Sequence, residues 1–351
     1  MITTRRNDCY ASCKSDQMLS VQLCGVTRAS SPVMTHAEVR ADRKPPSILQ
    51  DKSNIERRKR QSCYPSRWAA QFPSCGGLRQ SPINIVTSKV RVNSALPPFS
   101  FIGHSDRVNV TVQNKGHSAH FALPPSVQLT GGGLTGHYRA AQFHFHWGGD
   151  RRPGSEHTID GERFPMELHI VHIKAPYSSL AEAEHDMAGI ALLAFLFEES
   201  TDDHPHLDTV IAALGRVQNN GSSTVISSFR LRDVVPPADS LHGYYRYVGS
   251  MTTPGCEQAV AWTVFHRKLS ISSRQLDAII RQCRFWTGQP MTDTFRPTQP
   301  LDGRIVYCSM SGAAQTPVVH VWLCVFLVVF WSVMNSHMTS TGFMGEELQD
   351  V

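Results

Sequence analysis

The sequence lacks the closely spaced cysteine pairs that mark thiolate metal clusters and redox centres. Nine cysteines occur in 351 residues, but none of them forms a CxxC motif. A zinc site built from thiolates and a dithiol redox centre are therefore not indicated. The thiols do not resemble metal ligands, so other side chains have to be considered for that role.

A concentration of positive charge over a folded surface is also missing. The net charge is +5, yet the basic residues crowd into one short tract, residues 57–60 (RRKR). This distribution argues against a nucleic-acid partner. With 41% hydrophobic and 18% charged residues, the composition is that of a globular chain able to bury a sizeable core. The sequence gives no indication of a protein partner.

Residues 1–60 show neither helical nor strand periodicity. Their one apolar run, at residues 18–26, is interrupted by Ser20 and Gln22 and makes a poor signal-peptide core. Two interpretations stay open for this part: a disordered leader or an imperfect gene model, or a pro-segment cleaved after Arg60, where the basic tract ends.

The one long hydrophobic run lies near the C-terminus, at residues 318–334 (VVHVWLCVFLVVFWSVM). About 17 apolar residues is the lower limit for a membrane-spanning helix, and no Lys or Arg follows Arg304. Small residues at 311–314 make 309–317 a linker with a possible GPI-attachment site, although the polar tail at 335–351 fits a single-pass helix better. Either anchor places the protein on the extracellular face of the membrane. Two glycosylation candidates, Asn109 and Asn220, are compatible with export.

Residues 61–308 read as one domain without internal repeats. Short β-type runs are separated by Gly, Pro and Ser, and two helical patterns interrupt them, with Ser272 as a candidate N-cap. The pattern predicts an α+β fold: a single domain on a large, mainly antiparallel twisted sheet with short peripheral helices. The predicted strands are 107–113, 141–147, 166–173, 190–197 and 260–266, and the predicted helices are 206–217 and 272–283.

Two of these strands carry histidines in alternate positions. In residues 142–147 (QFHFHW), the strand period of two places Gln142, His144 and His146 on one face. In the next strand Glu167 and His169 share a face in the same way. A neighbouring strand can thus add a third imidazole to the first two.

Three neutral histidines that leave the fourth position to water define a catalytic zinc site, whereas a structural site closes all four positions. The alternative is that these are half-buried surface strands that happen to carry histidines. The spacing of three histidines, with Gln142 and Glu167 available as acceptors for their second ring nitrogens, favours the metal site.

The sequence resembles the α-class carbonic anhydrases over residues 80–304, and most of all their extracellular, membrane-anchored type IV and type XV branch. The motifs that carry the resemblance are 80–85 (QSPINI), 114–117 (NKGH), 142–147 (QFHFHW), 154–157 (GSEH), 167–169 (ELH), 249–254 (GSMTTP) and 295–300 (FRPTQP).

The resemblance implies a zinc enzyme for the reversible hydration of carbon dioxide to bicarbonate and a proton. His144, His146 and His169 would bind Zn²⁺, and Gln142 and Glu167 would orient His144 and His169. The carbonic anhydrases are themselves the standard example of a metal that lowers the pKa of its water to about 7, which yields a hydroxide nucleophile. The resemblance assigns the remaining polar roles to Thr252, Glu156 and Thr253. The hydroxyl of Thr252 would accept a hydrogen bond from the hydroxide and donate one to the carboxylate of Glu156, and Thr253 would hold bicarbonate.

By the same resemblance, an apolar wall receives carbon dioxide, and His117 shuttles the proton out. Leu192 and Met251 stand where the family more often has valine and leucine, so the shape of the pocket and the turnover can differ. Lys115 replaces a neutral residue near His117 and is expected to lower the pKa of the shuttle, while His120 can assist. The wall positions are Val171, Leu192, Met251, Val260 and Trp262.

The resemblance also implies a disulfide between Cys75 and Cys256, and it leaves Cys63 without its expected partner. Tyr64 matches the cavity tyrosine of the family in a shortened N-terminal stretch. Two other functions remain open: a carbonic-anhydrase-like domain kept for binding or adhesion at the cell surface, and a purely structural zinc domain. The second would need a fourth protein ligand that the sequence does not offer.

Overall fold

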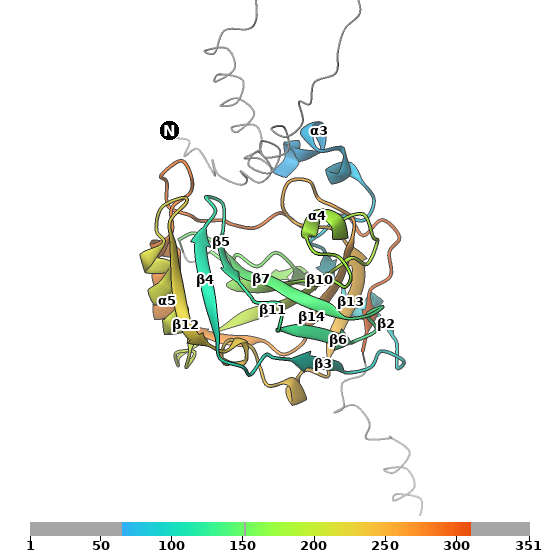
Figure 1. Ribbon diagram of the computed structural model, residues 1–351. Helices are drawn as coiled ribbons and strands as arrows, with labels where there is room; N and C mark the ends of the chain where they lie inside the picture. The colour runs from blue at the N-terminus through green and yellow to red at the C-terminus, as the bar shows by residue number, and fades with distance from the viewer. Residues whose placement is uncertain (1–64, 151, 310–351) are drawn as a thin grey trace, which may run out of the picture. The chain divides into compact units, whose positions relative to one another are not determined.

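One long twisted sheet organises the described part of the chain, residues 65–150 and 152–309 of the computed structural model (Figure 1). Its thirteen strands are β2 (Arg91–Val92), β3 (Phe99–Ile102), β4 (Val108–Asn114), β5 (Ala119–Ala122), β6 (Gln128–Gly131), β7 (Tyr138–Trp147), β10 (Met166–Lys174), β11 (Ile190–Ser200), β12 (Ser223–Phe229), β13 (Tyr244–Gly249), β14 (Val260–Phe265), β15 (Leu269–Ser272) and β16 (Tyr307–Cys308).

The strands of this sheet follow the order β12-β4-β5-β7-β10-β11-β14-β13-β16-β2. Within the described residues, its parallel pairings are β11 with β14, β11 with β15, and β16 with β2, and the other pairings are antiparallel. The predicted α+β class with a mainly antiparallel sheet is therefore confirmed. A smaller sheet consists of β1 (Asn84–Ile85), β8 (Thr158–Ile159) and β9 (Glu162–Arg163).

The helices are short and lie around the sheet. The predicted pair at 206–217 and 272–283 is confirmed as α5 (Leu207–Arg216) and α6 (Ser273–Gln282), which pack against each other, with α5 also on β12. Ser272 caps α6 by accepting a hydrogen bond from the amide of Gln275 at 3.1 Å. The other helices are α3 (Trp68–Gln71) and α4 (Leu180–Ala183), with 3₁₀ turns at Pro65–Arg67, Pro73–Gly76, Thr87–Lys89, Leu231–Asp233 and Ala238–Ser240.

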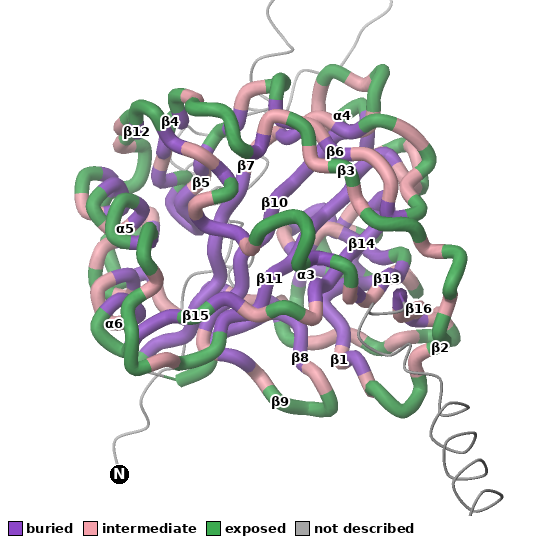
Figure 2. The backbone as a smooth tube through the Cα atoms, turned by 90° about the horizontal axis from the view of Figure 1, so that it is seen from below, coloured by how far each residue is buried: buried purple, intermediate pink, exposed green. Residues whose placement is uncertain are grey.

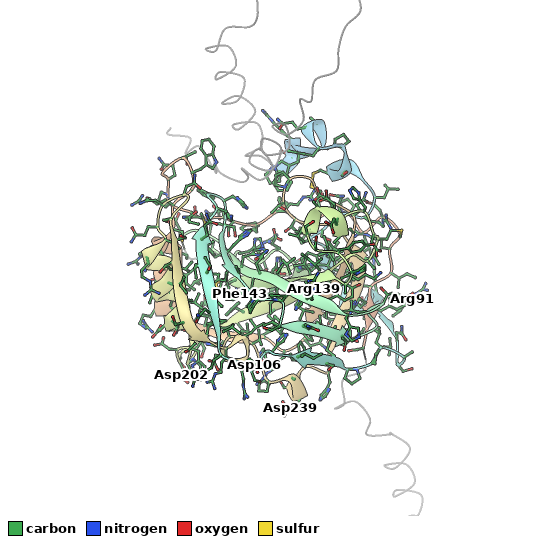
Figure 3. All side chains as sticks on the ribbon, viewed as in Figure 1. Arg91, Asp106, Arg139, Phe143, Asp202 and Asp239 are labelled. Carbon is green, nitrogen blue, oxygen red and sulfur yellow. A yellow bond between two sulfur atoms is a disulfide. The ribbon has the colours of Figure 1, made fainter. Side chains whose placement is uncertain are left out.

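The central strands β7, β10 and β11 are buried over most of their length (Figure 2). On one face Phe143 stacks on Phe121 at 4.5 Å between ring centroids and on Phe229 at 5.5 Å. Phe143 lies at the centre of the molecule in Figure 3, whereas exposed charges such as Asp202 and Asp239 lie at its rim. A core of this kind fixes which face each histidine of β7 and β10 can occupy.

The N-terminal part of the described chain is joined to the loop after β13 by a covalent bond. Cys75 and Cys256 form a disulfide across 181 residues, with 4.9 Å between their Cα atoms, and this prediction is confirmed. Cys283 and Cys308 are free. Asn109 and Asn220, the glycosylation candidates, have exposed side chains.

Several sequence predictions fall on residues outside the described ranges. They concern the leader at 1–60 with its cleavage after Arg60, Cys63, Tyr64, the small residues at 311–314, the apolar run at 318–334 and the tail at 335–351. In the ranges that are described, no helix is both long and apolar enough to cross a membrane.

Candidate metal centre

Antiparallel pairing of β7 with β10 brings three histidines together. The register places His169 opposite His144 and Glu167 opposite His146. Each of the three imidazoles offers one nitrogen, and these nitrogens all lie within 4.8 Å of one another. All three side chains are buried, with His144 the most exposed at 6%. This is the arrangement that the alternation of the two strands predicts.

The second nitrogen of each imidazole faces an oxygen. Nδ1 of His144 lies 2.9 Å from Oε1 of Gln142, and Nε2 of His169 lies 2.7 Å from Oε1 of Glu167. Nδ1 of His146 lies 2.5 Å from the main-chain carbonyl of Thr294. These contacts leave Nε2 of His144, Nε2 of His146 and Nδ1 of His169 for a metal, and the last two are 3.0 Å apart.

Thr294 is an orienting residue that sequence reasoning missed. It contributes a main-chain oxygen from a segment 148 residues away from His146, and a carbonyl leaves no trace in residue type. Its hydroxyl also accepts from the amide of Trp147 at 2.9 Å, so the segment is held along the end of β7. The one available signal is its place next to the motif at 295–300.

Burial favours the neutral imidazoles that a metal requires. It lowers the pKa of His144 well below its ordinary value, and the neighbouring His146 and His169 lower it further. Burial also lowers the pKa of His146, although the nearby Glu156 partly opposes this effect. Neutral nitrogens are therefore ready to coordinate an ion without first losing a proton.

Glu167 is a buried carboxylate with four hydrogen-bonding contacts. Burial alone would raise its pKa, but His157 and His169 lower it well below its ordinary value. Its Oε2 accepts from the amides of Glu156 and His157, at 2.7 and 2.8 Å, and its Oε1 lies 2.7 Å from Nδ1 of His157 and from Nε2 of His169. The carboxylate is thus fixed as an anionic acceptor for His169.

The hydrogen-bonded chain continues away from the three histidines. Nε2 of His157 lies 2.7 Å from the Tyr247 hydroxyl, which donates to Oγ of Ser81 at 2.9 Å. The residue types gave no reason to connect His157, Tyr247 and Ser81, which come from three distant parts of the sequence. One ligand atom from each of His157, Glu167 and His169 also lies within 4.8 Å of the other two. Their mutual hydrogen bonds explain that closeness.

Glu156 lies beside the same histidines. Its Oε1 accepts from the amide of Arg296 at 2.7 Å, and its Oε2 is 3.6 Å from Nε2 of His146 and 3.9 Å from Nδ1 of His169. Thr252 is buried in the loop after β13, and Thr253 is half-buried beside it. The hydrogen bond from Thr252 to Glu156 stays a prediction.

The residues expected to form an apolar wall gather in one cluster next to His169. Val171, Leu192 and Trp262 lie on β10, β11 and β14, and the two registers place them in one row across the sheet. The Trp262 ring is 4.9 Å from the His169 ring, and Val260 is buried in the same cluster. Met251 packs against the cluster while remaining partly exposed.

His117 is linked to the three histidines by ring contacts. Its ring centroid is 5.7 Å from that of His120, which lies 5.4 Å from that of His144. Burial lowers the pKa of His117 to about 4, while nearby His146 and Lys115 add smaller lowering effects and a hydrogen bond to the Lys115 backbone opposes them. The predicted lowering is confirmed. Its main cause is burial and not, as the sequence suggested, the charge of Lys115.

Comparison with known proteins agrees with this geometry. The profile of the eukaryotic-type carbonic anhydrases matches residues 63–310. The chain belongs to this family. It is 36% identical over 247 residues to carbonic anhydrase 4 of Rattus norvegicus, which covers 70% of this chain and 79% of the rat protein. It is 36% identical over 270 residues to carbonic anhydrase 15 of Mus musculus (73% and 83% covered) and 38% identical over 253 residues to carbonic anhydrase 7 of Homo sapiens (70% and 94%).

Membership makes the chain a carbonic anhydrase, an enzyme of carbon dioxide hydration. The family depends on zinc, and the donor set here fits that ion. Three imidazole nitrogens converge, and each imidazole is held by an acceptor on its other nitrogen. Carbonic anhydrase is itself the standard example of a three-histidine site with an open fourth position. His144, His146 and His169 could therefore hold a zinc ion.

Removing an acceptor should weaken the zinc site without removing a ligand. We expect Gln142→Ala to lower zinc affinity by about 10- to 100-fold, because His144 loses the contact that orients its ring. Competition with a zinc chelator measures this. Gln128→Ala is the control, because the side-chain amide of Gln128 donates to the Pro125 carbonyl at the surface. Equal affinity in Gln142→Ala and wild type would show that this contact does not orient His144.

Proposed function

We propose that the chain catalyses the zinc-dependent, reversible hydration of carbon dioxide to bicarbonate and a proton, with His144, His146 and His169 as the zinc ligands. The observation that carries the proposal is the convergence of three nitrogens from three buried imidazoles. The second nitrogen of each ring contacts an oxygen that orients the ring. When bound, zinc lowers the pKa of water from about 15.7 to about 7, a shift for which carbonic anhydrase is the reference case, and so supplies a nucleophile at neutral pH.

The protein's own groups then have to aim that nucleophile. We assign this role to Thr252 and Glu156: the hydroxyl of Thr252 accepts from the nucleophile and donates to the carboxylate. Glu156 suits the role because its Oε1 is held by the amide of Arg296 while its Oε2 faces His146 and His169. Thr253, half-buried beside Thr252, is assigned to bicarbonate.

Carbon dioxide carries no charge, so its binding needs an apolar surface that excludes water. The cluster of Val171, Leu192, Val260 and Trp262 supplies such a surface beside His169, and Met251 borders it. Trp262 is held in place because its Nε1 donates to the carbonyl of Ser250 at 3.0 Å. Leu192 and Met251 give this pocket its own shape, which we expect to alter turnover and not the reaction.

The test of the proposal combines metal content with activity. Purified protein should contain one zinc per chain and hydrate carbon dioxide in a stopped-flow assay, with inhibition by an aromatic sulfonamide. His169→Ala should lose both zinc and activity. His172→Gln is the matched control, because His172 lies on the same strand and pairs with Ala140, away from the three histidines. A zinc-free, inactive wild-type protein would favour the binding or adhesion domain, and zinc without activity would favour a structural site.

We further propose that His117 carries the proton out of the site, with His120 beside it. With a pKa of about 4, His117 is neutral at physiological pH and is a weaker proton acceptor than an imidazole titrating near 7. We expect His117→Ala to slow turnover by about tenfold in dilute buffer and added imidazole to restore it. His185→Ala, at an exposed histidine that follows α4, is the control. Unchanged turnover in His117→Ala would exclude the shuttle role.

For localisation, we propose an enzyme on the extracellular face of the membrane that is GPI-anchored near residues 309–317, with a single-pass helix as the alternative. The apolar run at 318–334 and the exposed Asn109 and Asn220 side chains support an exported, anchored chain. A phosphatidylinositol-specific phospholipase C should release the enzyme from expressing cells. Retention on the cells would indicate a single-pass helix instead, and secretion of a chain that still carries 318–334 would contradict both anchors.

A further inference from the structure

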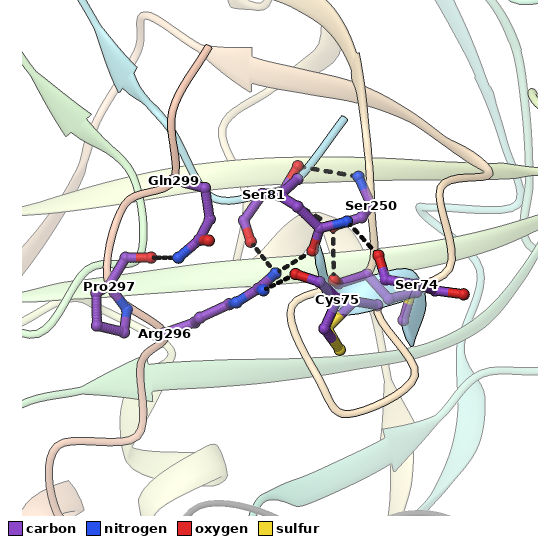
Figure 4. Close-up of a disulfide and its surroundings, with 10 residues drawn as sticks. Ser74, Cys75, Ser81, Ser250, Arg296, Pro297 and Gln299 are labelled. Carbon is purple, nitrogen blue, oxygen red and sulfur yellow. Dashed lines mark hydrogen bonds between the residues drawn. A yellow bond between two sulfur atoms is a disulfide. The ribbon is translucent and has the colours of Figure 1, made fainter. Parts of the chain in front are cut away.

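Arg296 is a buried arginine whose side chain contacts the N-terminal part of the described chain. It is 2% exposed, and its guanidinium donates to Oε1 of Gln80 at 2.9 Å and to the carbonyls of Ser81 at 2.8 Å and Cys75 at 3.4 Å (Figure 4). The same group lies 5.2 Å from the Trp68 ring. The side chain of Arg296 is thus fixed to the N-terminal part of the described chain.

The main chain of the same residue points to the active site. The amide of Arg296 donates to Oε1 of Glu156 at 2.7 Å. Two residues earlier, the carbonyl of Thr294 meets Nδ1 of His146 at 2.5 Å. One short segment therefore contacts both the active-site carboxylate and a metal-binding histidine, and the Arg296 side chain sets where that segment lies.

The structure to which Arg296 is fixed also holds the loop of Thr252. Cys75 is bonded to Cys256, four residues after Thr252. Ser81 and Ser250 exchange hydrogen bonds, each amide donating to the hydroxyl of the other, at 3.0 and 3.1 Å. The contacts of Arg296 with Cys75 and Ser81 therefore tie Glu156 to the same residues that hold the Thr252 loop.

Arginine suits this position for a geometric reason. A planar guanidinium presents donors in several fixed directions, whereas the ammonium of lysine is a single point at the end of a flexible chain. The acceptors of Arg296 belong to three different residues, Cys75, Gln80 and Ser81. Lysine would keep the charge but could not reach all three acceptors from one nitrogen.

We propose that Arg296 is a positioning residue for carbon dioxide hydration. Arg296 acts on Glu156 through its own main-chain amide. This inference rests on the role proposed for Glu156. The Arg296 side chain transmits the position of the Cys75–Ser81 segment to the carboxylate of Glu156. Glu156 and Thr252 are thereby both placed relative to that segment.

The test is a double-mutant cycle on carbon dioxide hydration, with Arg296→Lys, Glu156→Gln and the double variant. We expect Arg296→Lys to lower kcat/KM by about 10- to 100-fold, since a displacement of about 1 Å at a reacting group can cost that much. Adding Arg296→Lys to Glu156→Gln should cause no further loss, because its effect passes through the carboxylate. Losses that multiply, or an unimpaired Arg296→Lys enzyme, would overturn the inference.

The control and a milder variant separate positioning from stability. Gln299→Ala alters a neighbour whose side-chain amide donates to the carbonyl of Pro297 at 2.8 Å, and it should keep full activity. If Arg296→Lys does not fold, Gln80→Ala removes one acceptor of the guanidinium and should give a smaller loss that is again absent in the Glu156→Gln background.

The outcomes also distinguish this inference from the proposed function. If the wild type is active and Glu156→Gln is impaired, but the losses from Arg296→Lys and Glu156→Gln multiply in the double variant, the role of Arg296 alone is overturned. An inactive wild type, or a Glu156→Gln enzyme with wild-type activity, overturns both the role of Glu156 and that of Arg296.

Discussion

The active site depends on the antiparallel register between β7 and β10. Side chains alternate along a strand, so a slip of one residue would turn His169 to the opposite face and separate it from His144 and His146. The core opposes such a slip. Both strands are buried, and stacked rings of Phe121, Phe143 and Phe229 occupy the other face. The one irregularity in the pairing of β7 with β10 lies between Val171 and His172, after His169 along β10. The pairing at the three histidines themselves is regular.

The register brings the three imidazoles together, and hydrogen bonds then orient their rings. Gln142, Glu167 and the Thr294 carbonyl turn the three rings so that the nitrogens left for a metal converge. Burial makes neutral imidazoles favourable, while the four contacts of Glu167 keep that carboxylate ionised. The same buried environment that suits metal ligands lowers the pKa of His117 to about 4, and there it makes the imidazole a weaker acceptor for the proton that has to leave the site.

The sequence predicted those parts of the site that depend on residue type and alternation. The two histidine strands, Gln142 and Glu167 as acceptors, and the capped helix α6 follow from a period of two or from a capping side chain. The disulfide and the apolar wall came from resemblance, because pairing over 181 residues has no local signal. Main-chain contacts from Thr294 and Arg296 were missed, since any residue type has a carbonyl and almost any has an amide. The cause of the low pKa of His117 was missed because burial depends on the whole fold.

The central claim is that three imidazoles and no other protein group bind the metal. X-ray absorption at the zinc edge of the purified enzyme tests it most directly. The account predicts three nitrogen ligands at about 2.0–2.1 Å together with one light-atom ligand that exogenous anions replace. A closed shell of four protein ligands, a sulfur ligand, or a fourth ligand that no anion displaces would contradict it.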